Sequence, residues 1–281
     1  MGRFDHILIV TDLDYTFLGE GGALVPRNLE ALARFREQGG KFTIATGRNH
    51  VDAVYAIPNL AQIINAPAIV GNGTYLYDMQ AGKVLEASPM DFETTYEAVC
   101  QLRRELPELA LRVTTDNGVL TDYLSPTLAK VAEKKGADYF TVVPLEEWKP
   151  GVWYKVACQD TPQGAQKMYQ AFIRRYADLF ESCFSEPGIF EWHAIGCGKG
   201  VYVDRLREYY RKQEGFTPTV YACGDYENDR EMLGGADVAV CPSNAIDSIK
   251  EICDFCLCDH KQGVIADLIE LLEKQAIEEG K

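Results

Sequence analysis

Short apolar runs and helical patterns alternate at the start of the chain. Residues 6–10 form an apolar run of the length and kind that is buried in a parallel sheet. After Pro26, apolar side chains recur at helical spacing until Gly39 and Gly40, which can end a helix. Two more strands and a hairpin are then expected at Phe42–Ala45, Ala68–Val70 and Thr74–Leu85. This order is typical of the first half of an α/β fold.

The pattern changes in the middle of the chain. Asp116-Asn117-Gly118 separates two extended runs, which is a strong hairpin signal, and Pro187-Gly188 separates another pair. Strands are predicted at Leu111–Thr115, Val119–Tyr123, Tyr139–Val143, Trp153–Cys158, Leu179–Phe184 and Ile189–Ile195, and helices at Glu93–Leu106, Pro126–Lys135 and Pro162–Tyr176. Neighbouring strands joined by hairpins indicate an antiparallel sheet with helices on one face, a separate α+β unit.

The α/β alternation resumes after the glycines at positions 196, 198 and 200. The expected elements are a helix at Val201–Lys212, a strand at Val220–Cys223, a helix at Asn228–Leu233, a strand at Val238–Val240 and a helix at Val264–Lys274. We therefore expect residues 1–87 and 195–281 to form one α/β core with a mainly parallel sheet. Residues 88–194 are expected to form an inserted α+β domain.

Composition and charge exclude several classes of function. The 281 residues are 47% hydrophobic and 25% charged, which is ordinary for a globular protein. With 28 basic and 42 acidic residues the net charge is −14, so the surface repels nucleic acids and anionic membranes, and we expect neither as a partner. The early apolar run is too short for a membrane span, and nine scattered cysteines suit reduced thiols. We expect a cytoplasmic protein, either a monomer or a homodimer.

Polar residues follow the first two predicted strands. Asp12 and Asp14 come directly after the first, where one carboxylate could attack a phosphorus centre and the other could transfer a proton. The second strand ends in Thr46-Gly47-Arg48, where a hydroxyl and backbone amides could hold phosphate oxygens and Arg48 could reach a substrate anion. Taken singly, each motif could also be an ordinary loop or turn.

Two more candidate sites lie in the last third of the chain. Lys199 stands among glycines before a helix, so its point charge could approach a phosphate, or it could be a solvated linker residue. Asp225, Asn228 and Asp229 follow a predicted strand, and their hard oxygens suit magnesium. An acidic helix start is the alternative there. All four sites are predicted at the carboxyl ends of strands, where ligands bind in open α/β sheets.

Together, these sites and their order resemble the haloacid dehalogenase (HAD) superfamily of phosphatases. The position of the insertion, between Thr46 and Lys199, is similar to the large α/β cap of its Cof-type and sucrose-phosphate-phosphatase-type members. Asn72-Gly73 is similar to the Cof-type pattern. Tyr15 stands where many members have glycine, and Thr74 where alanine is usual. The resemblance implies a Rossmann-like HAD core with an inserted cap that determines specificity.

The resemblance also implies a role for each residue that matches a motif. Asp12 would be the nucleophile and a magnesium ligand, and Asp14 the general acid/base whose backbone carbonyl binds the metal. Asp225 would be a further metal ligand. The remaining matches would bind the phosphoryl group (Thr46, Lys199), contact the substrate (Gly47, Arg48, Asn72, Asn228) or hold the metal site and Lys199 in place (Asn228, Asp229).

The expected activity is magnesium-dependent hydrolysis of a small phosphomonoester, such as a sugar phosphate, through an aspartyl-phosphate. A sugar phosphomutase with the same chemistry is one alternative. A non-catalytic sugar-phosphate-binding module is another, although the intact Asp12 and Asp14 argue against it. Phosphate release from a generic phosphomonoester would exclude the binding module, and isomerisation without phosphate release would favour the mutase.

Two further groups of residues have competing interpretations. Cys253, Cys256, Cys258 and His260 could be a metal cluster, but we favour a core strand in which cysteine acts as a small apolar residue. Trp192 and His193 precede the glycine-rich linker. Core packing is their default role, and contact with substrate is the alternative.

Overall fold

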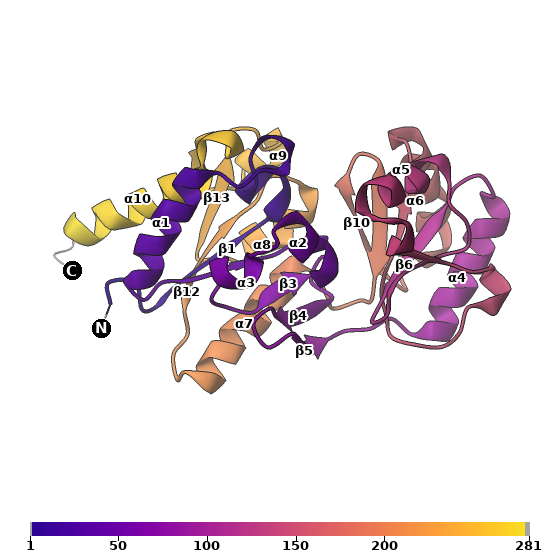
Figure 1. Cartoon of the computed structure of the whole chain (residues 1–281), viewed down its shortest axis with the longest axis horizontal. Coiled ribbons are helices and arrows are strands. Elements are labelled where there is room, and N and C mark those ends of the chain that lie inside the picture. Colours follow the sequence, from indigo (N-terminus) through magenta and orange to yellow (C-terminus); the bar gives the residue numbers. More distant parts are fainter. Residues whose placement is uncertain (1, 279–281) are drawn as a thin grey trace. The chain divides into compact units, whose positions relative to one another are not determined.

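The computed structural model describes residues 2–278, which divide into two compact units (Figure 1). One unit combines the described residues up to Glu86 with those from Gly198 onward, and the other is Ala87–Cys197. We call them the α/β unit and the inserted unit. The expected domain boundaries lie within three residues of these divisions, and residues 1 and 279–281 of the expected core lie outside the described residues. Within the described residues, no helix combines the length and the apolar character that a membrane span requires.

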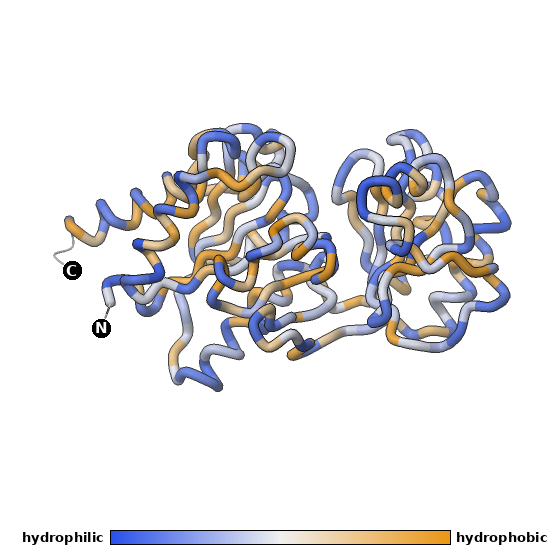
Figure 2. The backbone as a smooth tube through the Cα atoms, viewed as in Figure 1, coloured by the Kyte–Doolittle hydropathy of each residue, from blue (hydrophilic) through white to orange (hydrophobic). Residues whose placement is uncertain are grey.

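A five-stranded parallel sheet forms the centre of the α/β unit. Its order is β14-β13-β12-β1-β2, with bounds Phe255–Leu257, Val238–Pro242, Thr219–Cys223, Ile7–Thr11 and Lys41–Ile44. The apolar run that predicted β1 is buried from Leu8 to Val10, as a strand covered on both faces requires. The strands accordingly follow hydrophobic stretches of the tube in Figure 2.

Helices flank this sheet. The long ones are α1 (Pro26–Glu37), α7 (Lys199–Gln213) and α10 (Val264–Glu278), and the short ones are α2 (His50–Ala56), α3 (Leu60–Ile63), α8 (Arg230–Gly234) and α9 (Asp247–Lys250). α1 packs against α10, and α7 packs against α8 (Figure 1). The predicted strand at Ala68–Val70 (β3) starts a separate antiparallel sheet with β4 (Tyr75–Asp78) and β5 (Lys83–Ala87), joined to the end of β2 by a bridge between Ala45 and Ile69.

The inserted unit contains a six-stranded sheet of order β10-β11-β9-β6-β7-β8. The strand bounds are Glu181–Glu186, Ile189–His193, Trp153–Gln159, Leu111–Thr115, Gly118–Thr121 and Phe140–Val142, and only β7 and β8 run parallel. Side chains of α4 (Phe92–Glu105) and α6 (Pro162–Tyr176) share one apolar core with β6, β9 and β11. α5 (Pro126–Lys135) packs on a second, smaller core with Val119 and Phe140. The α/β fold with an inserted α+β unit is thus confirmed.

Two sequence-based expectations need correction. Lys199 does not follow a strand of the parallel sheet: it is the first residue of α7. The cysteine-rich strand β14 is a three-residue edge strand rather than a core strand, and Cys256 is exposed. For Trp192 the default expectation of core packing is confirmed, because its side chain is fully buried in the helix-covered core beside Phe172 and Phe190.

Candidate active site

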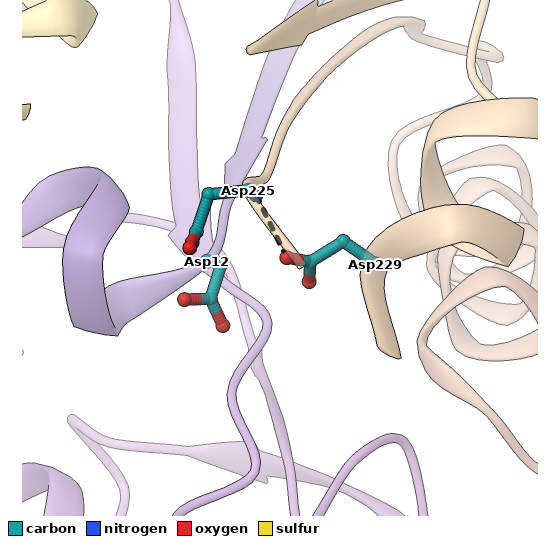
Figure 3. A group of neighbouring side chains, drawn as sticks. All are labelled: Asp12, Asp225 and Asp229. Atoms are coloured by element: carbon teal, nitrogen blue, oxygen red, sulfur yellow. Dashed lines mark hydrogen bonds between the residues drawn. The ribbon is translucent and has the colours of Figure 1, made fainter. Parts of the chain in front are cut away.

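The carboxyl ends of two neighbouring strands bring Asp12 and Asp225 together. β1 and β12 pair in parallel from Ile7 with Thr219 to Thr11 with Cys223, and the Asp12 N–H donates to the Cys223 carbonyl at 2.8 Å. Asp225 therefore emerges beside Asp12, and Asp229 reaches the same point from the turn that follows β12 (Figure 3). Carboxylate oxygens of the three residues lie within 4.8 Å of one another, and all three residues are buried.

Lys199 is enclosed by two of these carboxylates. Its Nζ lies 2.5 Å from an Asp12 oxygen and 2.6 Å from an Asp229 oxygen, and its side chain has no exposed surface. The backbone brings it there through a close approach of two loops, since the Gly198 N–H donates to the Gly73 carbonyl at 3.1 Å. A Cβ on Gly73 would lie 2.1 Å from the Gly198 oxygen, so only glycine allows this approach.

Asp229 holds the cluster through both of its oxygens. One binds Lys199, and the other accepts hydrogen bonds from the backbone N–H groups of Asp225 (3.0 Å) and Tyr226 (3.2 Å). The supporting role expected for Asp229 is consistent with these contacts. Thr16, which the sequence analysis did not assign, donates its hydroxyl to Asp225 at 2.6 Å. The sequence could have indicated this residue, because Thr16 follows Asp14 by two positions in the same loop.

Burial and like charge shift the pKa values of these groups. Burial, with Asp229 as the next largest cause, raises the pKa of Asp225 to about 7. Burial also raises the pKa of Asp12, against the opposing effect of Lys199. Burial alone would lower the pKa of Lys199, but Asp12 and Asp229 outweigh it and raise the value. The lysine is therefore a fixed positive charge among carboxylates that repel one another.

Arg48 binds Asp14 rather than standing free for substrate. Its Nε and Nη2 each donate to one Asp14 oxygen at 2.7 Å, which is the bidentate geometry of strong arginine–carboxylate pairs. Both side chains are about 30% exposed, with 28% for Arg48 and 32% for Asp14. The general acid/base candidate is thus held by the residue expected to bind substrate.

The remaining predicted residues meet around the end of β2. Thr46 is buried and its hydroxyl accepts a hydrogen bond from the Arg48 N–H at 3.1 Å, while the Asn72 N–H donates to the Thr46 carbonyl at 2.9 Å. Asn72 also accepts from the Asn228 side chain at 3.1 Å. A Cβ on Gly47 would lie 3.0 Å from the Asn72 amide oxygen, so this position is closely packed. Asn72 and Asn228 thus link the ends of β3 and β12.

Tyr15 adopts a backbone conformation that favours glycine. Its φ is +58°, which explains why glycine is common there in the superfamily that the sequence resembles. Asn244 donates to the Tyr15 carbonyl at 2.9 Å, and the His260 ring packs edge-on against the Tyr15 ring. His260 therefore supports the Asp12–Asp14 loop.

The donor set at this site suits a hard divalent cation. Asp12, Asp14, Asp225 and Asp229 together with Lys199 and Arg48 leave a formal charge of −2, and the side chains of Asp12, Asp225 and Asp229 offer carboxylate oxygens as ligands. Such ligands favour magnesium over zinc. Among residues 2–278, Asp12, Asp225 and Asp229 bring their ligand atoms close enough together to hold a metal ion. The cysteines around Cys256 do not form such a group in this part of the chain.

Replacing Lys199 tests the electrostatics of the cluster. We expect Lys199→Met to lower the free energy of unfolding of the metal-free protein by about 3–5 kcal/mol, because it leaves buried carboxylates uncompensated. Magnesium should restore part of this loss by supplying positive charge. Urea unfolding with chelator and with magnesium measures both effects, and Lys212→Met, at an exposed position of α7, is the matched control. A loss below about 1 kcal/mol would contradict this view of the cluster.

Comparisons with known proteins agree with this geometry. The family model for haloacid dehalogenase-like hydrolases matches residues 9–269. A pyridoxal phosphate phosphatase of Escherichia coli is 28% identical over 274 residues, which cover 93% of this chain and 97% of that protein. An HMP-PP phosphatase of Serratia proteamaculans is 27% identical over 247 residues, covering 87% and 86%.

A solved structure of a HAD/COF-like hydrolase from Plasmodium vivax has the same fold, with a TM-score of 0.82 and 20% identity over 98% of this chain and 97% of that one. This identity supports the fold alone. The family match spans both segments of the α/β unit, including Asp12, Thr46, Lys199 and Asp225, and the inserted unit. The chain belongs to the haloacid dehalogenase-like hydrolase family.

Proposed function

We propose that the protein is a phosphatase that hydrolyses a small phosphomonoester through an aspartyl-phosphate on Asp12. The observation that carries this proposal is the buried pair of Asp12 and Asp225 at the carboxyl ends of adjacent parallel strands, with Lys199 bound to Asp12. The E. coli and S. proteamaculans relatives, which are named as phosphatases, support it. Magnesium is the proposed cofactor, with Asp12, the Asp14 backbone carbonyl and Asp225 as its protein ligands.

The proposed reaction has two displacement steps. In the first, an Asp12 oxygen forms a bond to phosphorus while the bond from phosphorus to the leaving oxygen breaks, and Asp14 gives that oxygen a proton. In the second, Asp14 takes a proton from water, which attacks phosphorus and frees Asp12 and inorganic phosphate. Lys199 and Thr46 neutralise and orient the phosphoryl oxygens. A bound magnesium ion would add positive charge for the phosphoryl group.

The Arg48–Asp14 pair has a consequence for this sequence of steps. Asp14 must present an oxygen to the leaving group to give it a proton, whereas in the structure both of its carboxylate oxygens accept hydrogen bonds from Arg48. We propose that Arg48 leaves Asp14 when substrate binds and turns to an anionic oxygen of the substrate. The same residue would then bind substrate and release the general acid.

The metal requirement is a direct test. We expect activity on p-nitrophenyl phosphate to be lost with chelator and restored by magnesium, because the site offers hard oxygen ligands and an excess of negative charge. The measurement is the hydrolysis rate after dialysis against chelator and addition of single metals. Restoration by zinc and not by magnesium would show that the site chemistry is misread.

The substrate is proposed only as a class. Sugar phosphates follow from the sequence resemblance, and pyridoxal phosphate and HMP-PP follow from the names of the relatives. A panel of these compounds, assayed for released phosphate, ranks them by kcat/KM. Phosphate release excludes the binding module, and isomerisation without release would favour the mutase.

We further propose that the inserted unit determines which substrate is preferred. It has its own sheet and cores, whereas the proposed reacting groups all lie in the α/β unit. Of the two residues first considered for contact with substrate, Trp192 packs in a core and His193 lies on the opposite face of the sheet. Single contacts that select among substrates typically change kcat/KM ratios about ten- to two-hundred-fold.

A further inference from the structure

One face of the sheet in the inserted unit carries buried charges. Strand register places Arg112, Ala157 and Glu191 in one row across β6, β9 and β11, because Ala157 pairs with both neighbours. The next row contains Lys155, which pairs with His193. Val156 and Trp192, which alternate with these residues, belong to the core covered by α4 and α6, so the charged side chains occupy the other face.

The charges nearest Arg112 do not balance, although Glu181 brings the two rows as a whole to zero. The Lys155 Nζ lies 2.8 Å from a Glu191 oxygen, and both side chains are almost fully buried at 1% and 2% exposure. Arg112 adds a second positive charge, and its side chain is 13% exposed. Glu181 also lies on this face opposite His193, but on β10, three strands away from Arg112 in the sheet order. The group around Arg112 therefore has a net charge of about +1.

The guanidinium of Arg112 lacks the hydrogen bonds that burial demands. Its Nε is buried and has no hydrogen-bond partner among residues 2–278. Its Nη2 is 3.9 Å from the same Glu191 oxygen that Lys155 binds, beyond hydrogen-bond distance. Leaving a buried charged donor unpaired is costly, so a partner at this edge would stabilise the protein.

The unpaired edge has a geometry that selects its partner. Nε and Nη2 are the two donors that Arg48 uses to bind Asp14 at 2.7 Å, so the equivalent edge of Arg112 is suited to a carboxylate or a phosphate. Ala157, the small residue between Arg112 and Glu191 in the row, adds no polar group to this part of the face. The alternative to a ligand site is a structural ion pair, in which Arg112 only stabilises the buried carboxylate of Glu191.

We propose that Arg112, beside the Lys155–Glu191 pair, forms an anion-binding site in the inserted unit that takes a carboxylate or phosphate group of a ligand. Arg112 supplies the two parallel N–H donors and the uncompensated charge. Lys155 keeps Glu191 neutralised, so that the carboxylate does not repel the ligand. The site lies outside the group around Asp12 and does not depend on the proposed phosphatase activity.

The test compares anion binding by the full chain and three variants. Inorganic phosphate and acetate are titrated separately by calorimetry in the presence of chelator, because the carboxylates around Asp12 then repel anions. We expect Arg112→Met to weaken binding about 10- to 100-fold and Arg112→Lys to weaken it less. Arg174→Met, at an exposed position of α6, should bind like the wild type. Binding of phosphate alone identifies a phosphoryl ligand, and binding of acetate alone a carboxylate.

Thermal unfolding separates this site from a structural ion pair. Without anion, Arg112→Met should be at least as stable as the wild type, because an unpaired buried charge is removed. The stabilisation that phosphate or acetate gives the wild type should be reduced in this variant. Equal anion affinity in Arg112→Met and wild type, or a clear loss of stability without anion together with an unchanged response to it, would overturn the proposal.

Discussion

Asp12→Asn should lower kcat by about 10⁴-fold or more while the protein remains folded. An amide oxygen is a poor nucleophile towards phosphorus, and the substitution also removes charge that the cation needs. The fold should persist because Asp12 belongs to a cluster with excess negative charge, and Lys199 retains its contact with Asp229. The measurement is the steady-state rate on p-nitrophenyl phosphate, together with the melting temperature from circular dichroism.

Asp247→Asn provides the matched control for this prediction, since Asp247 is 97% exposed on α9 and makes the same change of charge. It should hydrolyse substrate at the wild-type rate. If Asp12→Asn retained more than a small fraction of wild-type activity, Asp12 could not be the nucleophile.

The second large effect concerns Asp14 and depends on the leaving group. For alkyl phosphates, whose leaving oxygen needs a proton, Asp14→Asn should reduce kcat/KM by ~10²–10⁴-fold. For p-nitrophenyl phosphate the loss should be smaller, because that leaving group departs without protonation. The comparison requires both substrates with the same enzyme preparation and the same magnesium concentration.

Arg48→Met is the companion variant, because it removes the partner of Asp14 without changing Asp14 itself. If Arg48 binds substrate after leaving Asp14, this variant should raise KM for both kinds of substrate to a similar degree. Equal losses for alkyl and aryl phosphates in Asp14→Asn would argue against general acid catalysis by this residue.

The sequence predicted the features that depend on local pattern. A buried apolar run followed by polar residues locates the end of β1 or β12, so Asp12 and Asp225 could be placed at one edge of the sheet. The hairpin at residues 116–118 and the helices that begin at Pro126 and Pro162 follow from turn and N-terminal preferences, and the structure has them at these positions.

Features that depend on contacts distant in sequence could not be predicted in this way. Lys199 reaches Asp12 because Gly73 and Gly198 approach each other, and no strand directs it there. The Arg48–Asp14 pair depends on side-chain rotamers in two different loops. Burial of Arg112 depends on its place in a row formed by three strands, which is known only once the register is known.

The position of β14 at the edge of the sheet could not be predicted from the sequence pattern either. Apolar and cysteine residues near Cys256 fit a core strand, but β14 is the outermost strand of the parallel sheet, where a side chain can face solvent. The order of strands, not the composition of this one, decides its exposure.

The central claim is that hydrolysis proceeds through a covalent phosphoryl intermediate on Asp12. The stereochemical course at phosphorus tests this claim most directly. A phosphorothioate monoester, made chiral at phosphorus by sulfur and two oxygen isotopes, is hydrolysed by the wild-type protein in water of the third isotope, and the configuration of the released thiophosphate is determined. Two successive in-line displacements, first by Asp12 and then by water, invert phosphorus twice, so we predict overall retention. Overall inversion would mean that water attacks the substrate directly and would contradict the account.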